Sequence, residues 1–352
     1  MTRGGGRRIA VVVFNLGGPD SAATVRPFLF NLFNDKAIIG LPAPFRTLLA
    51  WWISSRREKP AQANYALMGP RWNGGSPLLP QTLEQTTALE AVLGERLPGD
   101  TVRVFTAMRY WHPMTAETVT RVTAWTPDQL VLLPLYPQYS TTTTASSVKA
   151  WTETYRGPGV TRTVCCYPQA PGWIESQAAA IRACLEEAGN RPMRVLFSAH
   201  GIPERLVTQK GDPYQEQVEA GCAAVAARAG LTDWSICYQS RVGPMTWLGP
   251  STPEAICQAA VDGVGVVIAP IAFVSEHIET LVELDIEYAE LAEQVGARPY
   301  LRVPTPGTAA PFIETLAEAT VQALDRTGTA PFGPGCQGDR AACPCQAERR
   351  AA

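Results

Sequence analysis

Apolar runs of strand length alternate with segments of helical periodicity along most of the chain. The strand-like runs are rich in Val, Ile and Leu, and they lie at 9–16, 102–108, 130–136, 161–167, 193–199, 235–240 and 265–273. Near-continuous apolar runs are typical of parallel strands that are covered on both faces. Helical patterns lie between or after them, at 114–125, 172–188, 213–229, 252–262 and 311–326. The alternation predicts an α/β fold built from βαβ units.

The segment after the last long strand, "FVSEHIETLVELDIEY" (273–288), carries a row of carboxylates. At about 100° per residue in a helix, five glutamates fall within an arc of about 80° between two apolar flanks: Glu276, Glu279, Glu283, Glu287 and Glu290. An ordinary amphipathic helix would turn this stripe to water. A buried helix would instead direct the carboxylates into a cavity, to hold a cation or move protons. The pattern alone leaves both interpretations open.

All three histidines of the chain follow the ends of predicted strands. They are His112, His200 and His277. In open α/β sheets, ligands bind outside the carboxyl ends of the strands. A single histidine at such a place is usually structural, but three of three favour a chemical role.

Two loops at the same edge contain candidate anion-binding groups. The hydroxyl-rich loop "YSTTTTASS" (139–147) could bind a carboxylate or phosphate, or cap the helix expected at 146–155; we favour capping with some ligand contact. The loop "NLGGPDS" (15–21) lacks both the G-x-G-x-x-G spacing and the lysine of a P-loop, which argues against a nucleotide-dependent enzyme.

The composition is that of a globular protein of ordinary charge. The 352 residues are enough for two domains, and 30 basic against 32 acidic residues give a net charge of −2. No basic run with interleaved aromatic residues predicts nucleic-acid binding. The apolar run near the N-terminus reads as a strand instead of a signal peptide, and no run reaches the length of a membrane span. We therefore expect a cytoplasmic protein.

The segment 41–57, "LPAPFRTLLAWWISSRR", is unusually aromatic. Its neighbouring Trp51 and Trp52 precede the basic pair Arg56 and Arg57. This combination suits a membrane interface or the entrance of a hydrophobic ligand, whereas a core helix under a loop is the alternative. Adjacent tryptophans point in different directions on a helix, so we favour an exposed lip.

Three of the nine cysteines lie in a polar tail, at Cys336, Cys343 and Cys345. Such a tail makes a poor core, and metal ligation is the preferred interpretation over an oxidation-prone disordered tail. Zinc and iron–sulfur sites both take four thiolates. The fourth would come from Cys165 or Cys166, and because strand neighbours point to opposite faces, only one of the two is expected to bind.

Several motifs together resemble the ferrochelatase family. They are "FNLGGPD", "NGGSPLLPQT", "RYWHPMT", "LYPQYS", "FSAHGIPERLVTQKGDPY", "YQSRVGPMTWLGPST" and "PIAFVSEHIETLVELDIEY". The resemblance covers nearly all of residues 8–326. It implies two similar Rossmann-like, chelatase-type domains with parallel sheets and a cleft between them, and a final helix that returns to the first domain. The expected boundaries are 8–140 plus 306–330 for the first domain, 141–305 for the second and 331–352 for the tail.

The resemblance also implies roles for individual residues. His200 is the expected general base, with Glu279 opposite and His277 and Glu283 nearby, and His200 and Glu279 are the expected contacts of the Fe²⁺ substrate. The expected porphyrin contacts are Leu16, Arg57, Tyr65, Ser76, Arg109, Tyr139, Gln239, Ser240, Trp247 and Phe273. The cysteine tail resembles that of members with a 2Fe–2S cluster.

The implied function is insertion of Fe²⁺ into protoporphyrin IX, with release of two protons, as the last step of haem biosynthesis. Alternatives are insertion into coproporphyrin, insertion of another metal, and a non-catalytic porphyrin or haem carrier, which would need no acidic stripe. The implied partners are porphyrin and ferrous iron, with peripheral membrane contact at the lip. Family members occur as homodimers or monomers.

Overall fold

The computed structural model describes residues 6–241, 243, 245–333 and 340–345. The chain forms two compact units. The first contains the described residues up to Tyr136, together with Ser140–Cys165 and Leu316–Ala330; the second contains Pro137–Tyr139, Cys166–Thr315 and the described residues from 331 onward. The boundaries expected from the sequence differ from these units, in which Ser140–Cys165 belongs with the first, as does the part of the last helix from Leu316 onward.

The first unit is built on a parallel five-stranded sheet. Its strands are β1 (Arg8–Asn15), β2 (Thr101–Met108), β3 (Gln129–Pro134), β4 (Val160–Val164) and β9 (Thr329–Ala330), in the order β2-β1-β3-β4-β9. The helices that belong wholly to this unit are α1 (Val25–Phe33), α2 (Ala43–Leu67), α3 (Leu78–Arg96), α4 (Thr115–Trp125) and α5 (Thr144–Thr154). Helix α11 (Ala310–Leu324) contributes its second half.

The central strand β1 explains why this sheet is buried on both sides. Seven of its eight residues are buried, as its continuous apolar run predicts. On one face Val12 and Phe14 pack against Val122 of α4 and Trp151 of α5. The two aromatic rings meet edge to face, with centroids 6.0 Å apart.

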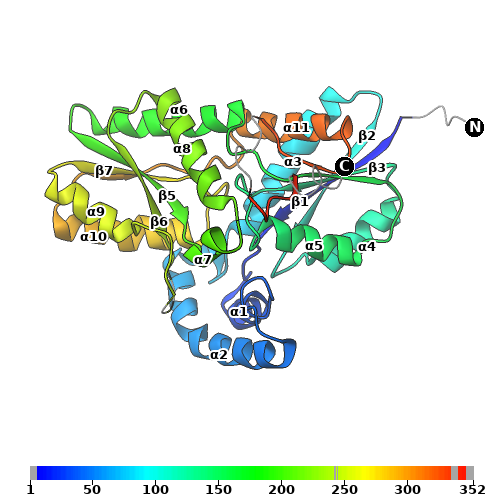
Figure 1. The fold of residues 1–352 in the computed structure, drawn as a ribbon, viewed down its shortest axis with the longest axis horizontal. Coiled ribbons are helices and arrows are strands. Elements are labelled where there is room, and N and C mark those ends of the chain that lie inside the picture. Colours follow the sequence, from blue (N-terminus) through cyan, green and yellow to red (C-terminus); the bar gives the residue numbers. More distant parts are fainter. Residues whose placement is uncertain (1–5, 242, 244, 334–339, 346–352) are drawn as a thin grey trace, which may run out of the picture. The chain divides into compact units, whose positions relative to one another are not determined.

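The second unit has its own parallel sheet. Its strands are β5 (Met193–His200), β6 (Trp234–Gln239), β7 (Gly265–Pro270) and β8 (Tyr300–Arg302), in the order β6-β5-β7-β8. Its helices include α6 (Pro171–Ala188), α7 (Glu204–Thr208), α8 (Tyr214–Ala229), α9 (Thr252–Val261) and α10 (Tyr288–Val295). Figure 1 shows α6 and α8 on one face of this sheet, and α9 and α10 on the other.

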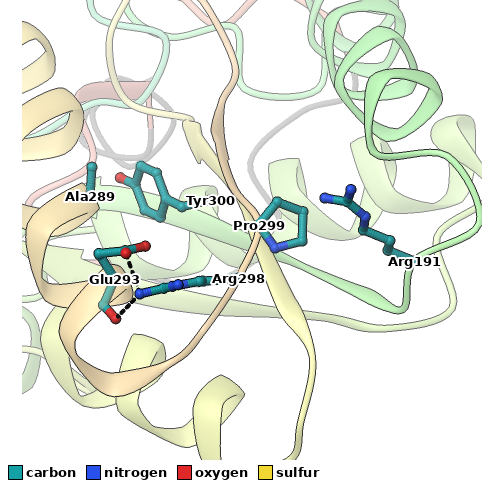
Figure 2. A pocket seen from close by; sticks show the side chains of 6 residues that line it. All are labelled: Arg191, Ala289, Glu293, Arg298, Pro299 and Tyr300. Carbon is teal, nitrogen blue, oxygen red and sulfur yellow. Dashed lines mark hydrogen bonds and ion pairs between the residues drawn. The ribbon is translucent and has the colours of Figure 1, made fainter.

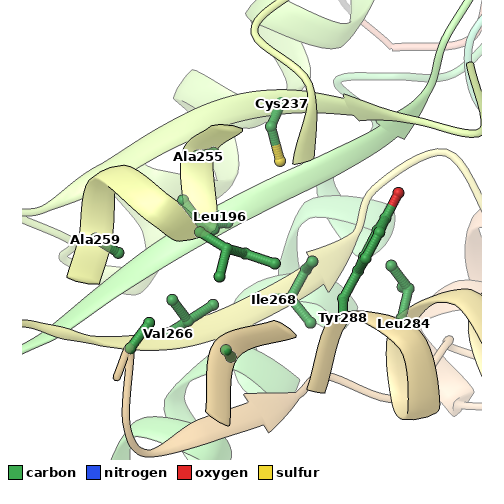
Figure 3. Packing of buried hydrophobic residues seen from close by; sticks show 11 residues of the cluster. Leu196, Cys237, Ala255, Ala259, Val266, Ile268, Leu284 and Tyr288 are labelled. Atoms are coloured by element: carbon green, nitrogen blue, oxygen red, sulfur yellow. The ribbon is translucent and has the colours of Figure 1, made fainter. Parts of the chain in front are cut away.

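Leu196 and Ile268 on neighbouring strands form part of a buried apolar cluster with residues of α9 and with Leu284 and Tyr288 (Figure 3). This cluster fixes the acidic segment to the sheet, so the side chains on the opposite side of that segment are held in a defined orientation.

The acidic segment is not the α-helix that its periodicity predicts. Residues Glu279–Glu287 form a π-helix, with hydrogen bonds from i to i+5, and α10 continues from it. Glu276 lies before this π-helix and does not join the predicted stripe. Its carboxylate pairs with Arg302 at 2.8 Å and accepts hydrogen bonds from Thr305. π-Helices are rare and often lie at functional sites.

The seven predicted strands are confirmed in position, whereas the short β8 and β9 were not predicted. Within the described part of the chain, every helix is either too short or too polar to span a bilayer.

Candidate active site

The predicted histidine and glutamate residues of the second unit meet at the carboxyl edge of its sheet. His200 is the last residue of β5 and pairs in register with Gln239, the last residue of β6. The segment that follows the neighbouring strand β7 brings Phe273, His277 and Glu279 to the same edge. The strand order reverses between β5 and β7, and this is the place where ligands bind in open α/β sheets.

Two imidazole rings face one carboxylate. His200 Nε2 lies 3.6 Å from Glu279 Oε1, and His277 Nε2 lies 3.8 Å from Glu279 Oε2. The other ring nitrogen of each histidine lies against a backbone carbonyl: His200 Nδ1 is 2.7 Å from Gly201 O, and His277 Nδ1 is 3.1 Å from Ser275 O. A carbonyl only accepts, so Nδ1 carries the hydrogen. When a ring also carries a hydrogen on Nε2, it is a cation and this N–H group faces the Glu279 carboxylate.

Glu279 remains an anion in this setting. Burial by itself would raise the pKa of its carboxyl, but the nearby His200 and His277 outweigh burial and lower the pKa to about 2. Its Oε2 atom is buried and has no hydrogen-bond partner among the described residues. Two imidazole nitrogens thus flank one anionic carboxylate, each facing a different carboxylate oxygen.

Aromatic side chains border these groups. The ring of Phe273 meets that of His277 edge to face at 4.5 Å between centroids, and its distance to the His200 ring is 6.5 Å. Trp247 lies beside Gly201, since a Cβ built on this glycine would be 3.4 Å from the indole ring. These two predicted porphyrin contacts are therefore next to the histidines, where apolar walls for a flat ligand are needed.

Glu283 has a different environment from Glu279. Its Oε1 accepts hydrogen bonds from Ser240 N at 2.9 Å and Tyr288 Oη at 2.7 Å. Its Oε2 accepts from Gln239 Nε2 at 3.0 Å and Ser240 Oγ at 2.5 Å. Further along, Glu287 and Glu290 are exposed. The pKa of Glu287 is raised by partial burial and by the negative charges of Glu283 and Glu290, as expected for crowded carboxylates.

Predicted porphyrin contacts of the first unit gather near the carboxyl ends of β1 and β2. Leu16 O accepts a hydrogen bond from Tyr110 N, next to Arg109, and Ser76 lies against Gly18. The Arg109 guanidinium bonds Asp35 Oδ2 at 2.8 Å and Ser146 Oγ at 2.8 Å. The same Asp35 also accepts from Ser146 and Tyr110.

The other predicted contacts differ in exposure. Arg57 is exposed on α2, 6.0 Å from the Phe33 ring, whereas Tyr65 on the same helix is buried. Tyr139 is buried in the second unit, with its backbone N–H bonded to Gln217. Gln239 is fully buried and its amide bonds protein groups, an environment that does not favour direct contact with a propionate.

The predicted lip is the N-terminal half of α2. Four of its large apolar side chains are more than half exposed: Phe45 (67%), Leu48 (67%), Trp51 (54%) and Trp52 (51%). Arginine side chains lie over both indole rings, Arg56 at 5.3 Å from Trp52 and Arg26 at 5.9 Å from Trp51.

The cysteines of the tail lie partly outside the described residues. Cys336 is not among them, while Cys343 and Cys345 are buried. The tail contacts the second unit: Ala342 N donates to Gly211 O, and Arg340 pairs with Glu216 on α8. Gln217, the next residue of α8, donates its amide to the Cys166 thiol at 3.6 Å. No group of three or more His, Cys, Asp or Glu side chains within the described ranges could hold a metal ion.

His112, the third histidine, is a surface residue of the first unit. It pairs with Glu117 at 2.7 Å, and Glu117 also accepts the N–H of Met114 at the start of α4. Its role is helix capping.

Sequence reasoning missed three partners of the site. Tyr214 donates its hydroxyl to His200 O at 3.0 Å, Tyr288 bonds Glu283, and Asp35 binds Arg109. Tyr214 and Tyr288 lie inside motifs that were noted, but their contacts depend on the fold.

A depression of about 560 Å³ lies elsewhere on the second unit, lined by Arg191, Ala289, Glu293, Arg298, Pro299 and Tyr300 (Figure 2). Arg298 pairs with Glu293 there, and none of the predicted site residues lines it.

Comparison with known proteins identifies the family. A model of the ferrochelatase family matches residues 8–324. A ferrochelatase of Phenylobacterium zucineum is 59% identical over 342 residues, covering 96% of this chain and 98% of that protein. A ferrochelatase of Caulobacter vibrioides is 58% identical over 348 residues, with coverages of 97% and 98%. Among solved structures, SirB from Bacillus subtilis with Fe³⁺ has a TM-score of 0.48 at 10% identity, covering 91% of this chain and 94% of that chain. The chain therefore belongs to the ferrochelatase family, the lyases that insert ferrous iron into a porphyrin in haem biosynthesis.

Proposed function

We propose that the protein inserts Fe²⁺ into protoporphyrin IX at the carboxyl edge of the second sheet, with His200 and Glu279 as the central residues. The observation that carries this proposal is the pair of imidazole Nε2 atoms that face the anionic Glu279 carboxylate at 3.6 and 3.8 Å. Carboxylate and imidazole donors bind ferrous iron less tightly than thiolates do, so the ion can be passed on.

The reaction removes two N–H protons from the ring as four nitrogen–iron bonds form, and no electron is transferred. In our proposal, Fe²⁺ is held by Glu279 and His200 before it enters the porphyrin ring. When iron moves to the ring, the Nε2 lone pair of His200 becomes available for a pyrrole proton. The His200 side chain is 40% exposed, so it can release this proton to water and accept the second one. The Glu279 carboxylate stabilises the imidazolium in the meantime.

The porphyrin needs flat apolar walls and cationic partners for its propionates. Phe273 and Trp247 supply aromatic surface beside His200. Arg57 and Arg109 remain our proposed cationic contacts of the propionates. The other proposed porphyrin contacts are Leu16, Tyr65, Ser76, Tyr139 and Ser240. A distorted ring would present its nitrogen lone pairs to the metal, with the strain drawn from these remote contacts.

A single assay tests the central proposal. Purified protein is mixed anaerobically with Fe²⁺ and protoporphyrin IX, and loss of porphyrin fluorescence is followed. His200→Ala should lower turnover at least about 100-fold and leave porphyrin binding measurable. His112→Ala is the matched control, because His112 is an exposed histidine of a helix cap. Near-normal turnover of His200→Ala would remove the base assignment, and tight porphyrin binding by the wild type without metallation would instead support a carrier.

We further propose that the exposed apolar face of α2 touches a membrane surface. Four large apolar side chains and flanking arginines are the composition of an interfacial helix, which favours the membrane-partitioned protoporphyrin over coproporphyrin. On this basis we expect a cytoplasmic protein at the inner face of a membrane. Replacing Trp51 and Trp52 by Ser should reduce co-sedimentation with anionic lipid vesicles, and unchanged sedimentation would contradict the proposal.

We also propose that the tail carries a 2Fe–2S cluster bound by Cys336, Cys343, Cys345 and Cys166. The support is the burial of the last three thiols and the contact of the tail with α8, whose Gln217 bonds Cys166. Cys165 is less suited because its backbone pairs with β9 in the first unit. A bound cluster would supply a covalent link between tail and body. Purified protein should be red-brown, and Cys166→Ser should bleach it; colourless protein with stoichiometric zinc would overturn the proposal.

A further inference from the structure

The carboxylate of Glu283 has no free acceptor position. Each of its two oxygens accepts two hydrogen bonds, from Ser240 N, Ser240 Oγ, Gln239 Nε2 and Tyr288 Oη. A carboxylate offers about four lone-pair sites, and all of them are therefore in use. Passing a proton through Glu283 would require one of these bonds to break first.

One of these donors, the side-chain amide of Gln239, connects Glu283 to the reacting residues. The Gln239 amide nitrogen donates to Glu283 Oε2 and also to the backbone carbonyl of Glu279, at 3.0 and 3.1 Å. The Gln239 amide oxygen accepts from Ser198 Oγ at 2.8 Å, and Ser198 lies two residues before His200 on β5. A continuous, buried hydrogen-bonded path thus joins the strand of His200 to the backbone of Glu279.

Ser240 is held by Glu283 in an unusual backbone conformation. Its φ is +61°, which lies in the left-handed region that is unfavourable for residues other than glycine. Both its N–H and its hydroxyl point to Glu283. The loop after β6 is therefore locked onto the first turn of the π-helix by this one carboxylate.

Tyr288 anchors the same carboxylate from the other side. Its ring packs in the apolar cluster with Leu284 and Ile268, and Figure 3 shows its hydroxyl directed away from that cluster. The hydroxyl donates to Glu283 at 2.7 Å. Tyr288 thereby holds the Glu283 carboxylate in a fixed position relative to the buried core of the sheet.

We infer that Glu283 is a positioning residue, which acts with Gln239 to hold the Glu279 carboxylate opposite His200, and is not a member of a proton relay. The inference rests on the proposed roles of His200 and Glu279. It also replaces the predicted role of Gln239 as a porphyrin contact by one in the support of the π-helix.

Two conservative variants separate positioning from relay. Glu283→Gln keeps the length of the side chain and one acceptor oxygen, and its NH2 group can donate to the hydroxyl of Ser240 or Tyr288, but it cannot carry a carboxyl proton. Glu283→Asp keeps the ionisable group but is one methylene too short to reach all four donors. A positioning residue requires kcat to fall less in the Gln variant than in the Asp variant, whereas a relay requires the opposite order. Neither change creates a large cavity, so both proteins should fold.

The measurement is kcat and KM for porphyrin, at a temperature at which circular dichroism shows each variant to be folded. We expect Glu283→Gln to keep kcat within about tenfold of wild type and Glu283→Asp to lose about tenfold more, with KM changed less than about twofold. Glu293→Gln and Glu293→Asp are the controls, because Glu293 is an exposed glutamate of α10 paired with Arg298 outside the site (Figure 2). They should match the wild type.

Three outcomes would overturn the inference: a higher kcat in the Asp than in the Gln variant, equal losses in both, or wild-type kcat in both. Failure of the proposed function would be recognised earlier, because the wild type itself would then not metallate protoporphyrin or His200→Ala would be active.

Discussion

Glu279 is half-buried and Asp35 is buried, and burial alone would raise the pKa of each carboxyl. In both cases the surrounding groups reverse the direction. The Glu279 carboxyl has a pKa of about 2 because of two histidines, and the pKa of Asp35 is lowered mainly by donors from Ser146, Ala37 and Tyr110 and by the charge of Arg109. The two carboxylates differ in their hydrogen bonds. Glu279 keeps one buried oxygen without a hydrogen-bond partner among the described residues, whereas Asp35 binds and fixes Arg109.

Replacing Asp35 by Asn should destabilise the first unit. The amide would place N–H groups where Arg109 and Ser146 donate, and we expect a loss of about 2 kcal/mol in the free energy of unfolding at pH 7, measured by urea denaturation.

The pH dependence of this loss in the free energy of unfolding follows from the lowered pKa of Asp35. A carboxyl with a lowered folded-state pKa adds stability above its unfolded pKa of about 3.9, and this stability is lost as the pH falls through the folded value. The difference between wild type and Asp35→Asn should therefore shrink from pH 7 towards pH 3. A difference that is constant over this range would contradict the linkage.

At the scale of elements, one arginine binds the π-helix to the neighbouring strand β8. Arg302 of β8 pairs with Glu276 before the π-helix and with Asp285 inside it, and its side chain is 15% exposed. Burial would lower the pKa of Arg302, but these two carboxylates raise it, so the guanidinium stays charged.

Removal of this arginine should loosen the acidic segment. Arg302→Met leaves two carboxylates without their cation, and we expect a loss of about 3 kcal/mol in the free energy of unfolding, together with reduced kcat. The control is Arg298→Met, in which an exposed pair with Glu293 is lost at a cost below about 0.5 kcal/mol. Equal stabilities of the two variants in thermal or urea unfolding would count against this role of Arg302.

The elements that the sequence predicts well are those with strong local signals. β7 is buried throughout, and β1 is apolar and buried from Ile9 to Phe14, so the positions of both strands are predicted to within a few residues. β8 (Tyr300–Arg302) and β9 (Thr329–Ala330) have two or three half-buried residues, too few for a period to show. The π-helix escaped prediction because apolar spacing does not distinguish hydrogen bonds to i+4 from those to i+5.

For the site, a position directly after a strand indicated candidates but did not separate them, since His112 also follows a strand and lies on the surface outside the site. His200, His277 and Glu279 were predicted from their places after β5 and β7, and the structure brings them together. Asp35 and Arg109 are 74 positions apart, and no local pattern links them. Glu276 was misplaced because the helix was assumed to start before it.

At the scale of the whole molecule, the chain leaves each unit and returns to it. The first unit is completed by residues 316–330, and the second is completed by the described tail residues. Both units therefore depend on chain segments that are far away in sequence, and neither corresponds to a continuous half of the protein.

Removing the tail should change the chemistry of the second unit. Cys166 is 1% exposed, and the tail binds α8 next to the glutamine that contacts it. A chain ending at residue 333 should therefore show at least about one more thiol that reacts with Ellman's reagent under native conditions. The same truncation with Cys166→Ser should not show it. Equal thiol counts in the truncated chain with and without Cys166→Ser would argue against protection by the tail.

The wide turns of the π-helix at 279–287 restrict the number of residues that this segment can contain. Each of its hydrogen-bonded loops contains one residue more than an α-helical loop. Deleting one residue between Glu279 and Glu283 would let this turn close as an ordinary α-helix, because an α-helical turn takes one residue fewer. Tyr288 and the residues beyond the deletion would keep their orientation. The spacing that lets Glu279 face the histidines while Glu283 accepts from Ser240 would change.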